Sequence, residues 1–170
     1  MNCWMGDEKV PLPDLNTQDA QVQAAYGDWI ENLVQEYSLD GLRIDGTCLA
    51  SICHTSISTF FPAAKHVNND FWGTFCAKAG IFCMGEVFGD DIALASQYQG
   101  SGTLDSILNF PVYNALVDAF KIPGDANTSG LASVHDSMKA RFSDVTVLGN
   151  FLENHDLPRW HNLSVDPQSL

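Results

Sequence analysis

The sequence predicts an α/β fold in which helices cover a parallel sheet. Apolar segments at 42–45, 81–87, 104–108 and 146–152 lack the alternation of a half-exposed strand, so both faces of each strand are expected to be buried. Segments with helical periodicity separate these strands, as in βαβ units. The fold is therefore either an open doubly wound sheet or an arc of a (β/α)₈ barrel.

The first helix is expected to begin after Asn16 or Thr17, either of which can cap it, with Asp19 in its first turn. Apolar residues then recur at steps of three and four along one face. They are Val22, Tyr26, Trp29, Ile30, Leu33, Val34 and Tyr37. The break at 38–41 ends this helix, and the first buried strand follows at 42–45.

A second helix is predicted over 65–79, with Gly80 as its stop, and a second strand over 81–87. The third strand is predicted over 104–108. A helix follows it, and Pro111 suits the first turn of this helix. Another helix is expected over 131–142. The fourth strand, 146–152, leads into a polar segment at 153–156.

Composition and charge narrow the possible partners. The 170 residues include 21 acidic and 8 basic side chains, which give a formal charge of −13. This charge repels nucleic acid and anionic membrane surfaces, so we expect neither as a partner, and we expect a monomer. The five cysteines show no zinc-binding spacing. No signal peptide is visible at the first residues, and the uncharged run 46–64 is too rich in Ser, Thr and Cys for a membrane span.

Acidic residues follow three of the four predicted strands: Asp45, Glu86 and Asp156. Because the carboxyl ends of parallel strands gather around one site, these side chains are expected to converge. Converging carboxylates can hold a divalent metal for phosphoryl transfer, or they can flank a glycosidic bond as nucleophile and general acid. The sequence contains no Gly-rich phosphate loop, which favours the sugar chemistry.

The neighbouring residues suit these roles. Arg43 lies two residues before Asp45, so both side chains point to the same side of the strand, and the positive charge keeps Asp45 ionised as a nucleophile requires. Glu86 follows an apolar strand, where desolvation and a nearby carboxylate raise its pKa, as an acid requires. His155 offers a hydrogen-bond donor for a sugar hydroxyl.

Four motifs, in this order, resemble those of the α-amylase family of glycoside hydrolases: DGLRID at 40–45, KH at 65–66, GEV at 85–87 and ENHD at 153–156. The surrounding sequence is most similar to the secreted fungal members. The resemblance implies a partial (β/α)₈ TIM barrel, roughly strands 4 to 7 with their helices. Residues 1–16 would then be the end of a B domain, and 17–170 would belong to the catalytic barrel.

The resemblance also implies a function: retaining endo-hydrolysis of α-1,4-glucosidic bonds in starch or malto-oligosaccharides. Asp45 matches the nucleophile, Glu86 the acid/base and Asp156 the third carboxylate. The other matching positions bind substrate or calcium. Arg43, Lys65, His66 and His155 match substrate-binding positions, and Asp14 and His66 match calcium ligands.

Residues 46–62 interrupt this pattern, because removing them leaves GLRIDAAKHVNNDFW, which reads as a normal family segment. We interpret them as a translated intron; the alternative is a genuine Ser/Thr-rich loop. The insertion would displace the positions at 65–66 from the cleft, and a partial barrel leaves sheet edges unpaired. We therefore expect little or no amylase activity from this chain, although its full-length parent would be extracellular. Two alternatives stay open: an α-glucosidase or transglycosylase of the same family, and a non-catalytic glucan-binding remnant.

Overall fold

The computed structural model describes residues 4–6, 11–13, 15–46, 67, 69–122, 124 and 128–164. The strands are β1 (Trp4–Gly6), β2 (Pro11–Pro13), β3 (Gly41–Ile44), β4 (Phe82–Gly85) and β5 (Ser106–Ile107). The α-helices are α1 (Ala20–Tyr37), α2 (Asn69–Ala79), α3 (Ile92–Ala95), α4 (Phe110–Phe120), α5 (Ser129–Arg141) and α6 (Trp160–Leu163). Two 3₁₀ helices, η1 (Ser96–Tyr98) and η2 (Val145–Val147), complete the elements of the described residues.

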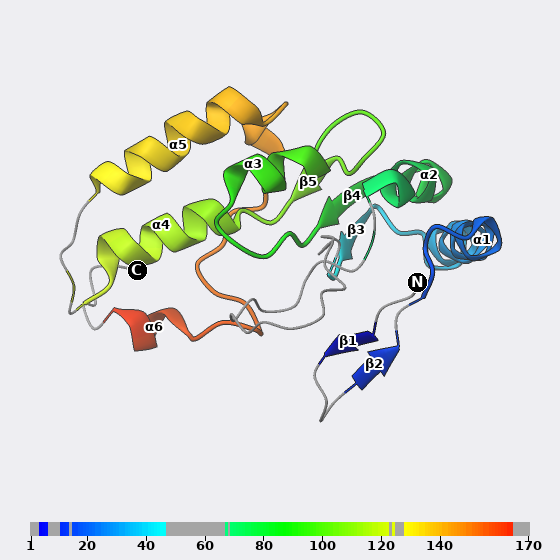
Figure 1. The fold of residues 1–170 in the computed structure, drawn as a ribbon, viewed down its shortest axis with the longest axis horizontal. Helices are drawn as coiled ribbons and strands as arrows, with labels where there is room; N and C mark the ends of the chain where they lie inside the picture. Colours follow the sequence, from blue (N-terminus) through cyan, green and yellow to red (C-terminus); the bar gives the residue numbers. More distant parts are fainter. Residues whose placement is uncertain are drawn as a thin grey trace.

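The central sheet is parallel, and its strands follow one another in chain order, β3-β4-β5 (Figure 1). A parallel bridge between Leu108 and Gly149 places a fourth segment beside β5. Gly149 donates to the carbonyl of Ile107 at 3.0 Å and accepts from the N–H of Asn109 at 2.9 Å. The four segments therefore lie side by side in the order in which they follow in the chain, which is the order of consecutive barrel strands. A separate antiparallel pair joins β1 to β2.

The core forms where α1 and α2 meet the strands. Ile30 of α1 is 2% exposed, and Phe71, Trp72 and Phe75 of α2 are all buried. Phe71 stacks on Phe75 and meets Trp72 edge to face, with ring centroids 5.0–5.5 Å apart. Cys83 of β4 and Val87, just beyond the strand, belong to the same cluster. The expectation that both faces of each strand are buried is wrong for the described residues: in β4, Cys83 is buried whereas Phe82 is 41% exposed, and no residue of β3 is fully buried.

Local capping sets the helix ends, as the residue types predict. The Asp19 carboxylate accepts from the N–H groups of Gln21 and Val22, so Asp19, rather than Asn16 or Thr17, caps α1. The stop predicted at Gly80 is confirmed, since this residue has φ of 66° directly after α2. Asn109 caps α4, and Pro111 lies in its first turn.

The predicted apolar stripe is present on α1, where Ile30 is buried, and two of its members are exposed, Trp29 by 53% and Tyr37 by 62%. One predicted element is wrong. The predicted strand 146–152 is instead a 3₁₀ turn followed by a single bridge at Gly149. The Asp144 carboxylate accepts from both the N–H and the hydroxyl of Thr146, which favours the turn over an extended strand.

Several other predictions fall outside the described residues. The segment 47–66 is among them, so the structure places neither most of the proposed insertion nor the beginning of the predicted helix 65–79. The helix is described from Asn69. Among the described residues, no helix is long and apolar enough to span a membrane.

Candidate active site

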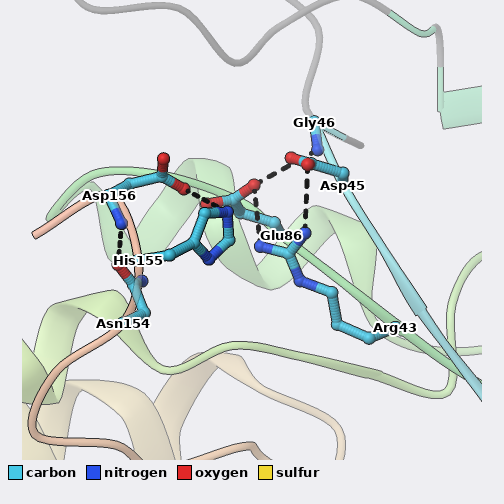
Figure 2. A network of polar contacts seen from close by, with 7 residues as sticks. All are labelled: Arg43, Asp45, Gly46, Glu86, Asn154, His155 and Asp156. Atoms are coloured by element: carbon cyan, nitrogen blue, oxygen red, sulfur yellow. Dashed lines mark hydrogen bonds and ion pairs between the residues drawn. The ribbon is translucent and has the colours of Figure 1, made fainter.

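The carboxyl ends of β3 and β4 bring Arg43, Asp45 and Glu86 into direct contact (Figure 2). The register pairs Arg43 with Met84 and Ile44 with Gly85, so the residues that follow both strands meet at one edge of the sheet. The N–H of Glu86 donates to the carbonyl of Ile44 at 2.9 Å, which extends the pairing to the acid itself. The predicted convergence of Asp45 and Glu86 follows from this register.

Arg43 forms an ion pair with each carboxylate. Its Nη1 lies 3.2 Å from Oδ2 of Asp45, and its Nη2 lies 3.2 Å from Oε2 of Glu86. The two acids differ in exposure, because the Asp45 side chain is 72% exposed whereas that of Glu86 is only 6% exposed. One guanidinium therefore holds an exposed and a buried carboxyl group together.

The environment shifts the two pKa values in opposite directions. Burial is the main reason that the pKa of Glu86 is raised, and its hydrogen bond with the Asp45 carboxyl adds to the effect. That same bond is the main reason that the pKa of Asp45 is lowered, with the Arg43 charge adding to it. A proton on this pair therefore resides on Glu86 while Asp45 is ionised, which is the division of roles between an acid and a nucleophile.

The backbone of Gly46 contributes a contact that the sequence did not indicate. Its N–H donates to Oε2 of Glu86 at 3.3 Å, and its φ is 61°. This left-handed conformation favours glycine. The donor is a backbone group, so nothing in the side-chain pattern of the sequence could reveal it.

The loop after Gly149 brings His155 and Asp156 to the same region. Nε2 of His155 lies 3.1 Å from Oδ2 of Asp156, and both side chains are at least half exposed. His155 is close enough to Asp45 for its charge to lower the pKa of that carboxyl, and Figure 2 shows His155 and Asp156 beside Glu86. The three predicted acids therefore lie in one region of the molecule.

Glu153 holds this loop, a role that the sequence pattern did not indicate. Its Oε1 lies 2.9 Å from Nη1 of Arg159, and its Oε2 accepts from the N–H of Trp160 at 2.8 Å. The side-chain oxygen Oδ1 of Asn154 accepts from the N–H of Asp156 at 2.9 Å. The side chains of Glu153 and Asn154 thus fix the course of the loop around His155.

Three predicted site residues, Asp14, Lys65 and His66, lie outside the described residues. The two calcium ligands predicted from the resemblance are among them, so the structure offers no test of their fit to the ion. Within the described part of the chain, no group of three or more His, Cys, Asp or Glu side chains is arranged to hold a metal.

Replacing Arg43 by Ala is expected to raise the pKa of both carboxyl groups. The guanidinium stabilises the ionised form of each acid, so its removal favours the protonated form of Asp45 and of Glu86. Carboxyl ¹³C NMR titration measures both values. Arg43→Lys keeps the charge but loses the two-pronged geometry, so smaller shifts are expected. An unchanged pKa at Asp45 in Arg43→Ala would contradict the ion pair.

Comparisons with known proteins show the family of the chain. The family profile described as "Alpha amylase, catalytic domain" matches residues 2–168. The chain is 41% identical over 164 residues to "Alpha-amylase 1" of Lipomyces kononenkoae, covering 96% of this chain and 23% of that protein. It is 36% identical over 169 residues to the α-amylase of Saccharomycopsis fibuligera, covering 99% of this chain and 30% of that protein.

A solved structure extends the likeness to three dimensions. The α-amylase from Malbranchea cinnamomea superposes with a TM-score of 0.82 at 36% identity, covering 98% of this chain and 31% of that one. The fold and these matches place the chain among the glycoside hydrolases. It belongs to the α-amylase family. It spans between 23% and 31% of the length of these three relatives.

Proposed function

We propose that the chain is the part of an α-amylase catalytic barrel that carries the reacting acids, corresponding roughly to strands 4 to 7. Residues 1–16 are then the end of a B domain and 17–170 the barrel segment. The reaction is the retaining endo-hydrolysis of α-1,4-glucosidic bonds in starch and related glucans. The contact of Asp45, Glu86 and Arg43, with its opposite pKa directions, is the observation that carries this proposal.

In the first step, the Asp45 carboxylate attacks the anomeric carbon while Glu86 gives its proton to the departing glycosidic oxygen. This forms a glycosyl ester on Asp45 and leaves Glu86 ionised. In the second step, Glu86 takes a proton from water, whose oxygen displaces Asp45 and restores both groups. Retention requires the two carboxyls to stand roughly 5 Å apart around the bound glycosidic bond, whereas inverting enzymes hold them about 6.5–9.5 Å apart. The direct Asp45–Glu86 hydrogen bond is closer than either, so substrate entry must separate the two groups, and retention is proposed from the family resemblance.

The remaining residues would position the substrate. Asp156 and His155 are half-exposed side chains with hydrogen-bonding capacity toward sugar hydroxyls. Lys65 and His66 are proposed to bind the glucan beyond the cleavage point. Asp14 and the backbone carbonyl of His66 are proposed to bind calcium, an ion that prefers such oxygen ligands. Secretion of the parent protein belongs to the same proposal.

Residues 46–62 are proposed to be a translated intron, and with them the chain is expected to be inactive. The test is a chimera in which residues 1–45 and 63–170 replace the matching segment of the Malbranchea cinnamomea α-amylase, and a second chimera that keeps 46–62. Starch hydrolysis is expected from the first chimera, and a loss of about 100-fold or more from the second. Hydrolysis by the isolated 170-residue chain would contradict the expected inactivity, and an inactive first chimera would contradict the proposed function.

A further inference from the structure

Two cysteines that the proposed reaction does not use lie on either side of the turn between α2 and β4. Cys76 is in the last turn of α2 and is half-buried, whereas Cys83 is the second residue of β4 and is 0% exposed. The chain reverses between them, through Gly80 with its φ of 66°. At this turn, the N–H of Gly80 donates a hydrogen bond of 2.9 Å to the carbonyl of Cys76.

This reversal brings the two residues to the same height above the turn. Cys76 lies three residues before the end of α2, a rise of about 4.5 Å along the helix axis. Cys83 follows the first residue of β4, a rise of about 3.3 Å along the strand. Cys76 packs against the apolar cluster to which Cys83 belongs.

The two thiols are near enough to affect each other, since their interaction raises the pKa of Cys76 and lowers that of Cys83. The Cys83 thiol also donates to the carbonyl of Ile81 at 3.5 Å, within the same turn. The sulfurs are not bonded to each other covalently in the structure. The Asp105 carboxylate, which accepts from the N–H of Cys83 at 2.8 Å, lies beside them.

Cys76 is the accessible member of the pair. It lines an open hollow of about 810 Å³ together with Gly80, Asp105 and Ser143, and Cys83 is not part of that lining. A small thiol reagent can therefore reach Cys76 from solvent, whereas it can reach Cys83 only through Cys76 or by opening of the core.

We propose that Cys76 and Cys83 form a disulfide bond when the chain meets a low-molecular-weight disulfide such as oxidised glutathione. The Cys76 sulfur attacks one glutathione sulfur, and the first glutathione leaves with the Cys76 proton. The Cys83 sulfur then attacks Cys76 in this mixed disulfide, and the second glutathione leaves with the Cys83 proton. The two thiols are oxidised, and one glutathione disulfide is reduced to two thiols.

The bond would connect α2 covalently to the strand that leads into Glu86. It needs no metal and no active barrel, so it is independent of the proposed function. Disulfides persist in extracellular surroundings, where the parent protein is proposed to act.

Tryptic mapping tests the bond, because Lys78 lies between the two cysteines. Cleavage there separates peptides 66–78 and 79–121, which remain joined only if Cys76 and Cys83 are bonded. The 170-residue chain is oxidised with glutathione disulfide, free thiols are blocked with iodoacetamide, and the denatured digest is analysed by mass spectrometry without reduction. The joined pair is expected, and it disappears after reduction.

A variant with Cys3, Cys48 and Cys53 changed to Ser removes other pairings, and Cys76→Ser in that background is the control. Glutathione retained on Cys76, or iodoacetamide on both cysteines, would overturn the proposal. The proposal would also be overturned if the ratio of reduced to oxidised glutathione at which half of the pair is oxidised were the same in buffer as in urea. The closeness of the two thiols in the fold is expected to favour the bond at least about tenfold over the unfolded chain, where they meet only by chance.

Discussion

Replacing Asp45 by Asn in the active chimera is expected to lower kcat for starch by roughly 10⁴-fold or more, because the amide cannot form the glycosyl ester. Arg43 and the Glu86 carboxyl already stabilise the ionised aspartate in the structure. The substitution preserves size, so the loss reports the missing nucleophile rather than a cavity. Asp136→Asn on the exposed face of α5 is the matched control and is expected to leave kcat unchanged.

Replacing Glu86 by Gln is expected to lower kcat by about 10²- to 10⁴-fold, the usual contribution of a general acid. The loss should be smaller for substrates with an activated leaving group, such as aryl maltosides, because their departure needs little protonation. Glu36→Gln on the exposed part of α1 is the control. Variants of Asp45 and Glu86 that retain more than about a tenth of the starting kcat would rule out the proposed roles.

The pH dependence of the Glu86 variant distinguishes its role further. The raised pKa of Glu86 keeps it protonated to a higher pH than an ordinary glutamate, so the alkaline limb of the kcat/KM profile reports its ionisation. That limb is expected to disappear in Glu86→Gln. Its persistence would mean that another group supplies the proton.

Replacing Gly73 by Ala is expected to lower the free energy of unfolding by about 2 kcal/mol, the scale of overpacking in a filled core. A Cβ at this position of α2 would meet the carbonyl oxygen of Gly102 and would lie 2.9 Å from its carbonyl carbon and 3.1 Å from its Cα. These are backbone atoms, so the loop at 100–103 must move as a unit. Alanine has a higher helix propensity than glycine, but this offsets only part of the loss in the free energy of unfolding.

Gly130→Ala on α5 is the matched control, because no atom lies within 4 Å of the added Cβ. The same change of residue is therefore expected to be neutral or to stabilise by up to about 0.5 kcal/mol. Urea unfolding of the 170-residue chain, followed by tryptophan fluorescence, measures both variants. Equal midpoints for Gly73→Ala and Gly130→Ala would show that α2 does not pack closely on the Gly102 loop.

The sequence by itself determined the local elements and the identity of the acids. Gly80 as the stop of α2 and Pro111 in the first turn of α4 were readable from neighbouring positions, whereas the cap of α1 is Asp19 and not the predicted Asn16 or Thr17. Apolar runs likewise predicted the strands β3 and β4, although not how far each of their faces is exposed. The family motifs pointed to Asp45, Glu86 and Asp156, and the structure brings all three into one region.

Only the tertiary structure decided how these residues meet. Whether Trp29 is buried depends on what packs against that face of α1, which helical periodicity does not specify. The Gly46 N–H, the Glu153 clamp and the closeness of Cys76 to Cys83 each depend on where the backbone or a side chain lies in space. Asp45 and Glu86 are far apart along the chain, and the register between β3 and β4 brings their side chains together. That register depends on how the apolar residues of both strands pack on the core, and it brings an exposed and a buried acid together, with the shared proton on the buried one.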